Sequence, residues 1–221
     1  MSFATTVPPF SASAAQPARL WLGEQPVPPF PPSGEVDGAF VDLDGERFYR
    51  IGQYDALPPF FMTIVSAFDH WLFVSSTGGM TAGRGDADGA LFPYVSVDRV
   101  HDSAGVTGGF SGVLVERQGR VGVWEPFTPA GRLVYRLSRN LYKSVTGHRL
   151  CFEEVNHDLG LTWRTEWTTS ERFGFLKRTT LCNDDELPVR VQVLDGIRNV
   201  IPAGVPRALL DAMSCLTDAY K

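Results

Sequence analysis

The sequence has few cysteines and no run of basic residues. Its three cysteines, Cys151, Cys182 and Cys215, are odd in number and widely spaced, and no CxxC pair exists. That spacing argues against a zinc site of the usual kind and favours a reducing compartment, so we predict a cytoplasmic location. The net charge is -5 and the basic residues do not cluster. Nucleic acid is therefore excluded as an expected partner, since it needs a concentrated basic face.

Long apolar runs are absent as well. No stretch approaches the roughly 18 residues of a membrane span, and the N-terminus does not show a basic segment followed by an apolar one. We therefore expect no membrane partner. The composition is 43% apolar and 20% charged, which is typical of a globular protein. A chain of 221 residues suits one large β-sandwich, and at this size roughly 70% of the unfolded surface becomes buried without disulfides.

Three regions follow one another along the chain. Residues 1–37 are rich in proline and contain Val-Pro-Pro-Phe twice, at 7–10 and 27–30. Because proline removes backbone donors, we predict an extended arm, anchored at Trp21 and Leu22, or a mobile leader. Residues 38–205 form the predicted β-sandwich, and residues 206–221 form a short helix.

The stretch from Leu57 to Tyr94 organises the body of the chain. Two apolar runs, Phe60–Val65 and Trp71–Val74, are bounded by turn residues, a pattern typical of a buried hairpin. Glycine is then so frequent from Gly78 to Gly89 that we predict an irregular polar loop in place of a helix or strand. Polar loops on rigid sheets commonly carry function.

The rest of the body alternates between apolar and polar residues, separated by turn signals. Asp44-Gly45 predicts a tight hairpin. The strand-like segments are 39–51, 91–100, 111–116, 120–124, 133–145, 150–156, 161–169, 173–181 and 189–200. With the central hairpin they make about eleven strands, which predicts an all-β fold, a large antiparallel β-sandwich.

The period changes after Pro206. Leu209, Met213, Leu216 and Tyr220 are spaced as one helical face. Such a stripe needs a partner surface, either the sandwich or a further domain reached through a linker, because an isolated short helix is marginal in water. We expect the chain to be a fragment of a larger protein.

Motifs for metals and cofactors are incomplete. Asp42-x-Asp44-Gly45 lacks the full calcium-loop spacing, and the glycines around Arg84 do not have the spacing of a dinucleotide loop. A serine nucleophile elbow is also missing. We expect no cofactor and no metal.

One segment resembles a known family. Thr179–Val191 reads Thr-Thr-Leu-Cys-Asn-Asp-Asp-Glu-Leu-Pro-Val-Arg-Val, in which Leu181-x-Asn183 ends a strand before a turn and another strand. With the order of elements from Phe40 to Tyr220, this resembles the N-terminal β-supersandwich of glycoside phosphorylases of the cellobiose phosphorylase type, which shares the galactose-mutarotase-like architecture. In that family a helical linker and an (α/α)-barrel follow, and the barrel carries the catalytic acid. The resemblance implies a module that is not catalytic on its own, partnered by carbohydrate, a following catalytic domain or a second copy of the chain.

The candidate ligand-binding residues lie around the polar loop and the strands beside it. They are His70, Trp71, Arg84, Asp86, Asp88, Tyr94, His101, Trp124 and Glu125. A mutarotase or epimerase would need a histidine and a carboxylate, and His70 or His101 could supply the first and Glu125 the second. Trp71, Tyr94 and Trp124 could stack on sugar faces, although aromatic residues on apolar strands more often belong to the core. Three hypotheses remain open at this point: a non-catalytic module of a carbohydrate-active enzyme, a stand-alone mutarotase or epimerase, and a plain interaction domain.

Overall fold

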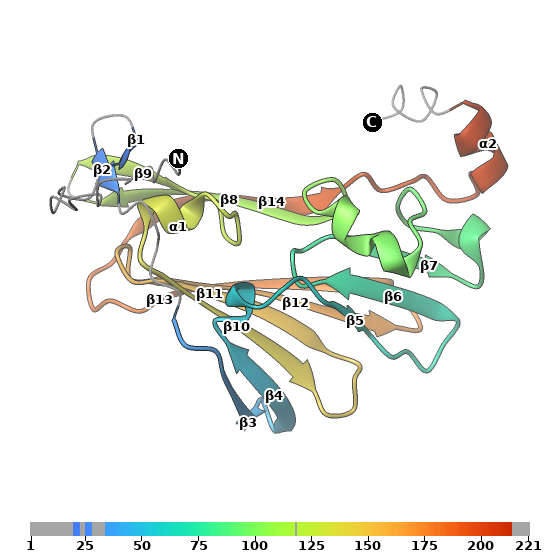
Figure 1. The fold of residues 1–221 in the computed structure, drawn as a ribbon, viewed down its shortest axis with the longest axis horizontal. Helices are drawn as coiled ribbons and strands as arrows, with labels where there is room; N and C mark the ends of the chain where they lie inside the picture. Colours follow the sequence, from blue (N-terminus) through green and yellow to red (C-terminus); the bar gives the residue numbers. More distant parts are fainter. Residues whose placement is uncertain (1–19, 23–24, 28–33, 118, 214–221) are drawn as a thin grey trace, which may run out of the picture.

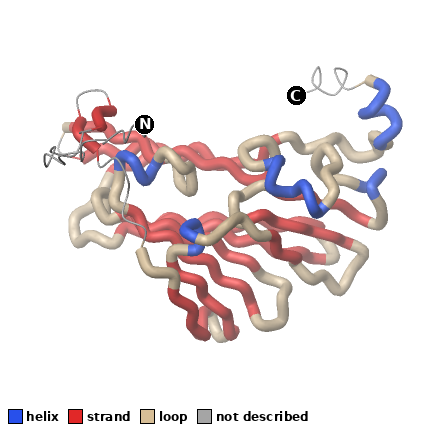
Figure 2. The backbone as a smooth tube through the Cα atoms, in the orientation of Figure 1, coloured by secondary structure: helices blue, strands red, loops and turns tan. Residues whose placement is uncertain are grey.

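The structure, a computed structural model, describes residues 20–22, 25–27, 34–117 and 119–213. Within these residues the chain forms antiparallel β-sheets in two layers (Figures 1 and 2). The all-β sandwich predicted from the alternating pattern is confirmed. Fourteen strands lie in the described part of the chain, against the eleven expected. The predicted anchor residues Trp21 and Leu22 lie in a two-stranded sheet formed by residues 20–22 and 25–27. The rest of the predicted arm up to residue 33 lies outside the described ranges.

One layer is a six-stranded antiparallel sheet in the order β13-β12-β11-β10-β4-β3. Its strands are β3 (Asp37–Leu43), β4 (Glu46–Gly52), β10 (Leu137–Ser144), β11 (Leu150–Asn156), β12 (Leu161–Ser170) and β13 (Gly174–Asn183). Asp44 and Gly45 both have positive φ, 53° and 79°, which is the geometry of the predicted two-residue turn between β3 and β4.

Two three-stranded sheets lie over one face of this layer (Figure 1). One has the order β14-β8-β9, from β8 (Gly108–Arg117), β9 (Arg120–Trp124) and β14 (Arg190–Arg198). The other has the order β5-β6-β7, from β5 (Phe61–Thr63), β6 (His70–Ser75) and β7 (Met80–Arg84). A separate pair joins β1 (Leu20–Leu22) and β2 (Gln25–Val27). Helical segments are short: η1 (Tyr54–Ala56), η2 (Ala87–Gly89), η3 (Val97–Ser103), α1 (Gly131–Val134) and α2 (Arg207–Ala212).

Strand β12 joins the two halves of the core. Its Trp163 packs with Val113 and Trp124 of the first small sheet, and its Trp167 belongs to the cluster with Leu72 of the second. Trp163 and Trp167 are four positions apart on an alternating strand, so both point to the same face. The apolar positions in the alternating segment from Leu161 to Trp167 therefore lie on the face that packs against both small sheets.

A buried ionic network ties the layers together beside η1 and α1. Glu154 is fully buried and accepts hydrogen bonds from Trp124 Nε1 at 2.7 Å, the Phe127 backbone N–H at 2.9 Å and Arg139 Nε at 2.6 Å. Arg139 also contacts Asp55 at 3.1 Å. Burial raises the pKa of Asp55, but the hydrogen bonds from Arg132 and the charge of Arg139 outweigh it and leave that pKa lowered.

Two predicted elements are wrong. Met80–Arg84 is strand β7, although we predicted an irregular loop from Gly78 to Gly89. Glycine is tolerated there because Trp71 lies against Gly83: a Cβ on Gly83 would come within 2.2 Å of Trp71 Cζ2. The segment predicted as a strand at 91–100 forms bends and the 3-10 helix η3 instead, in keeping with Pro93, which cannot donate to a ladder.

The C-terminal helix begins where predicted but does not bury its apolar side. Helix α2 follows Pro206, and Leu209 and Met213 remain 37% and 52% exposed. Of the two alternatives, docking on the sandwich is not seen for these two residues, and packing on a further domain stays a prediction. Leu216 and Tyr220, the other half of the predicted stripe, lie outside the described residues.

Across the described ranges, none of the helices combines the length and the apolar character that a membrane crossing requires.

Candidate functional site

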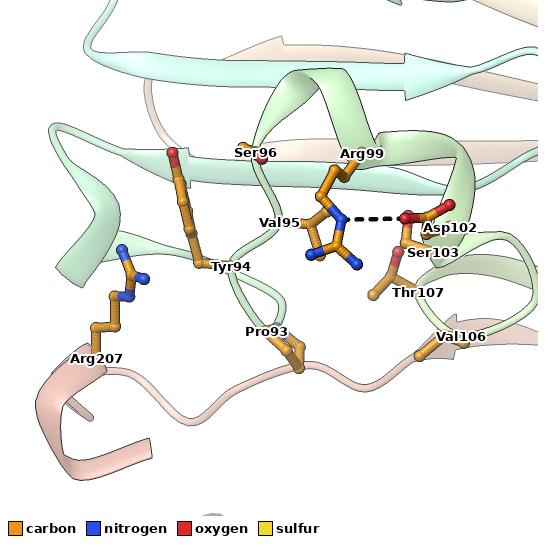
Figure 3. Close-up of a pocket in the computed structure, with 10 residues that line it drawn as sticks. All are labelled: Pro93, Tyr94, Val95, Ser96, Arg99, Asp102, Ser103, Val106, Thr107 and Arg207. Atoms are coloured by element: carbon orange, nitrogen blue, oxygen red, sulfur yellow. Dashed lines mark hydrogen bonds and ion pairs between the residues drawn. The ribbon is translucent and has the colours of Figure 1, made fainter. Parts of the chain in front are cut away.

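Two of the predicted ligand-binding residues, Trp71 and Tyr94, meet beside strand β7. The rings of Trp71 and Tyr94 contact edge to face, with centroids 6.1 Å apart. The Arg207 guanidinium carbon lies 5.0 Å from the centroid of the Tyr94 ring. An open cavity of about 400 Å³ adjoins this ring, and we call it the Tyr94 pocket. It is lined by Pro93, Tyr94, Val95, Ser96, Arg99, Asp102, Ser103, Val106, Thr107 and Arg207 (Figure 3).

Tyr94 is an exposed aromatic ring whose surroundings hold it in place. It is 40% exposed, although Trp71 and Arg207 both contact it. Figure 3 shows the ring between Arg207 on one side and the loop segment leading to Arg99 on the other. Aromatic and cation–π contacts each contribute about 0.5–1.5 kcal/mol, enough to fix a ring without covering it. The pocket therefore has a rigid apolar wall open to a ligand.

The polar groups of the pocket divide into those already used and those available. Ser103 Oγ donates to the Val100 carbonyl at 2.7 Å, and Thr107 Oγ1 donates to the Met80 carbonyl at 2.6 Å, so both hydroxyl protons are engaged. Arg99 and Asp102 form an ion pair at 3.1 Å and are 71% and 64% exposed. An exposed pair of this kind offers guanidinium donors and carboxylate acceptors to a ligand at little cost.

The polar loop after β7 holds helix α2 against the pocket. Asp86 caps η2 by accepting from the backbone N–H groups of Asp88 and Gly89, at 3.0 and 3.3 Å. Asp88 Oδ1 accepts from the Arg207 backbone N–H at 3.0 Å. These contacts place the Arg207 side chain over Tyr94. Asp86 and Asp88 thus act on the pocket indirectly, by positioning its neighbours.

Arg84 faces a different neighbour. Its Nε donates to Asp69 Oδ1 at 2.7 Å, and both side chains are more than half exposed. The hydrogen bond from Arg84 lowers the pKa of the Asp69 carboxyl. Arg84 therefore does not line the Tyr94 pocket.

The two candidate histidines do not meet. His101 shares a 2.7 Å hydrogen bond with Ser75 Oγ, at the last residue of β6, whereas His70 is the first residue of that strand. Five residues of strand separate these points by roughly 17 Å. Ser75 is fully buried, and His70, 8% exposed, packs against Phe175. Both histidines therefore hold structure together, and the expected joint site at the polar loop is not formed.

The last two predicted residues lie elsewhere. Trp124 is fully buried in the core and donates to Glu154. Glu125 is exposed at the end of β9, on the other small sheet. A site that joins Glu125 to His70 or His101 does not exist in this fold.

Sequence reasoning missed Arg99, Asp102 and Arg207. Arg207 lies 113 residues beyond Tyr94 in the chain, and only the packing of α2 brings the two together. Arg99 and Asp102 are three residues apart within η3, a spacing at which side chains of a helix are neighbours. The pair was missed because the segment 91–100 was predicted to be a strand. No group of three or more His, Cys, Asp or Glu side chains within the described ranges is arranged to hold a metal ion.

Comparisons with protein families and with curated proteins found no match to this chain.

Proposed function

We propose that this chain is a β-sandwich module of a carbohydrate-active protein and that the Tyr94 pocket contacts the sugar. One observation carries the proposal: an exposed tyrosine ring, fixed between Trp71 and Arg207, forms the wall of an open 400 Å³ cavity. Sugar rings present apolar C–H faces that pack on aromatic rings, while their hydroxyls need both donors and acceptors. Tyr94 supplies the aromatic ring, and the Arg99–Asp102 pair supplies the hydrogen-bond donors and acceptors.

The proposed role is to bind the sugar and to shape the substrate pocket of a larger protein, and this chain alone does not catalyse the reaction. A mutarotase-type reaction needs an acid and a base within reach of one sugar ring. The histidines lie at opposite ends of β6, and Glu125 lies on the other small sheet. The described residues around the Tyr94 pocket include a carboxylate in Asp102 but no histidine that lines the cavity.

Exposed apolar side chains support the idea of a module within a larger assembly. Leu209 on α2 and Met213 directly after it are exposed, and α2 also carries Arg207 of the Tyr94 pocket. Val121, Val123 and Leu194 are each about 60% exposed on the β14-β8-β9 sheet. Such groups suit burial against a further catalytic domain or a second copy of the chain. The proposal therefore includes a protein partner next to the sugar.

Sugar titration of a Tyr94→Ala variant tests the proposal. Glucose, galactose and cellobiose are titrated into the purified chain, and binding is followed by intrinsic tryptophan fluorescence, since Trp71 contacts Tyr94. Loss of the stacking face should weaken binding about tenfold, which corresponds to roughly 1.4 kcal/mol.

Phe173→Ala is the matched control. Phe173 is 66% exposed and has the Arg172 guanidinium carbon 5.1 Å from its ring centroid, as Tyr94 has Arg207. This variant should bind sugar as the wild type does. The proposal fails if the wild type binds none of the three sugars at millimolar concentration, or if both variants lose affinity equally.

A further inference from the structure

The outer face of the six-stranded sheet, the face away from the two small sheets, is strongly curved. Three strands separate β4 from β13, so these two would lie roughly 19 Å apart in a flat sheet. Yet Asp44, in the turn before β4, comes within 3.7 Å of Arg178 on β13. The sheet must therefore curl so that the β3–β4 turn reaches across its outer face.

This curl encloses a second cavity, which we call the outer-face pocket. Its volume is about 240 Å³, below the range usual for drug-sized ligands and suited to a smaller molecule. Its apolar side is formed by Leu43 and Phe48. Its charged side is formed by Arg149, Arg164, Arg178 and Glu166. It is separate from the Tyr94 pocket, because the two cavities share no lining residue.

The two carboxylates that line the outer-face pocket, Asp44 and Glu166, are both paired with arginines. Arg149 donates to Glu166 at 2.6 Å, lies 3.6 Å from Asp44, and stacks on Phe48 with its guanidinium carbon 5.1 Å from the ring centroid. Arg178 donates a further hydrogen bond to Glu166 at 3.1 Å. Arg149 also donates to Glu46 at 3.1 Å, so it is occupied by three carboxylates and holds them in place.

Donors remain on the other two arginines. Arg164 Nε is held by Glu153 at 2.5 Å, and within the described residues its two terminal nitrogens have no hydrogen-bond partner. Arg178 uses only Nη2 among the described residues, and its side chain is 61% exposed. Thr180 lines the same pocket, and its hydroxyl has no partner among the described residues. The guanidinium N–H groups of Arg164 and Arg178 and the Thr180 hydroxyl can therefore donate hydrogen bonds to a ligand.

The strand register places these donors around one point. Arg164 pairs with Thr180 across β12 and β13, and Glu166 pairs with Arg178. Arg164 and Arg178 are therefore diagonal neighbours on one face, about 7–8 Å apart at the backbone. Two guanidinium groups at that spacing can grip one planar or tetrahedral oxyanion from both sides. Nearby Cys151 adds no negative charge at neutral pH, because burial raises its pKa to about 12.

We propose that the outer-face pocket binds a small oxyanion, a carboxylate or phosphate group, between Arg164 and Arg178, with the Thr180 hydroxyl as a third donor. Asp44 and Glu166 keep Arg149 and Arg178 in place. The oxyanion belongs to a ligand small enough for the cavity under the β3–β4 turn. This site is independent of sugar binding at the Tyr94 pocket.

Isothermal titration of the purified chain with inorganic phosphate and, separately, with acetate tests the site at constant ionic strength set with chloride. Arg178→Gln should weaken binding at least tenfold. Because Arg178 is well exposed, this variant should keep the wild-type fold. Arg164→Lys should weaken binding too, since it keeps the positive charge beside Glu153 but replaces the planar fork by a single ammonium.

Arg190→Gln is the matched control. It removes the same charge from an arginine that is 77% exposed on strand β14, outside the pocket, and affinity should not change. Binding of phosphate alone identifies a phosphate group as the ligand, binding of acetate alone identifies a carboxylate, and binding of both supports an oxyanion site that accepts either group. The proposal is overturned if neither anion binds at millimolar concentration, or if Arg178→Gln and Arg190→Gln bind like the wild type.

Discussion

Replacement of Arg139 by methionine should cost more stability than any exposed charge removal in this protein. The Arg139 side chain is 5% exposed and donates to Glu154, to Asp55 and to the Thr128 carbonyl. Methionine fills the space but leaves Glu154, fully buried, without its cationic partner. Removal of one partner from a buried ion pair costs about 3–5 kcal/mol. For a chain of this size that corresponds to a drop in Tm of roughly 6–20 °C.

Equilibrium urea unfolding, followed by tryptophan fluorescence, measures this loss directly, because Trp124 is bonded to Glu154 and should report on the network. Arg136→Met is the control: Arg136 pairs with Asp158 but is 77% exposed, so its loss should cost less than about 1 kcal/mol. A double-mutant cycle with Glu154→Gln should show coupling of at least about 1 kcal/mol. A loss below about 1 kcal/mol for Arg139→Met, or additive single effects, would show that Arg139 does not stabilise the buried Glu154 carboxylate.

Three further outcomes are expected. The pKa of Asp55 is lowered in the folded protein, so this carboxylate contributes stability above about pH 4, and the contribution is lost as the pH falls through the folded-state pKa. Asp55→Asn should therefore reduce the fall of the urea midpoint at acid pH. An unchanged fall at acid pH would contradict this. Gly83→Ala should destabilise by about 1–3 kcal/mol through its clash with the indole ring, whereas Gly112→Ala, with open space around it, should shift the urea midpoint little; equal effects would exclude the clash. Arg84→Ala should leave Tm nearly unchanged and Asp86→Ala should cost about 1 kcal/mol as a lost cap, so a larger loss for Arg84→Ala in thermal unfolding would show a structural role.

The parts of the fold that depend on local pattern could be predicted from sequence. The turn at Asp44-Gly45 and the strands β11 and β12 follow from residues that are neighbours in the chain. Strand β7 was missed because Gly83 looks like a strand breaker until the indole of Trp71 lies over it, and that contact is tertiary.

The candidate sites were harder to predict for the same reason. Tyr94 was identified as a possible stacking residue, but its partner Arg207 is brought to it by packing of a helix distant in sequence. The outer-face pocket depends on sheet curvature, which brings Asp44 to Arg178 across three intervening strands. Periodicity assigns a residue to a face of a sheet, but it does not report how far that sheet curls.

The central claim is that a sugar contacts the ring of Tyr94. Two-dimensional ¹H–¹⁵N NMR of the labelled chain, titrated with cellobiose and with glucose, tests it most directly. Shifts that saturate are expected for the backbone of Tyr94 and Ser96, for the Arg99 side chain and for the Trp71 indole N–H, while Phe173 stays unchanged. Shifts absent at this pocket, or spread over the surface without saturation, would contradict it.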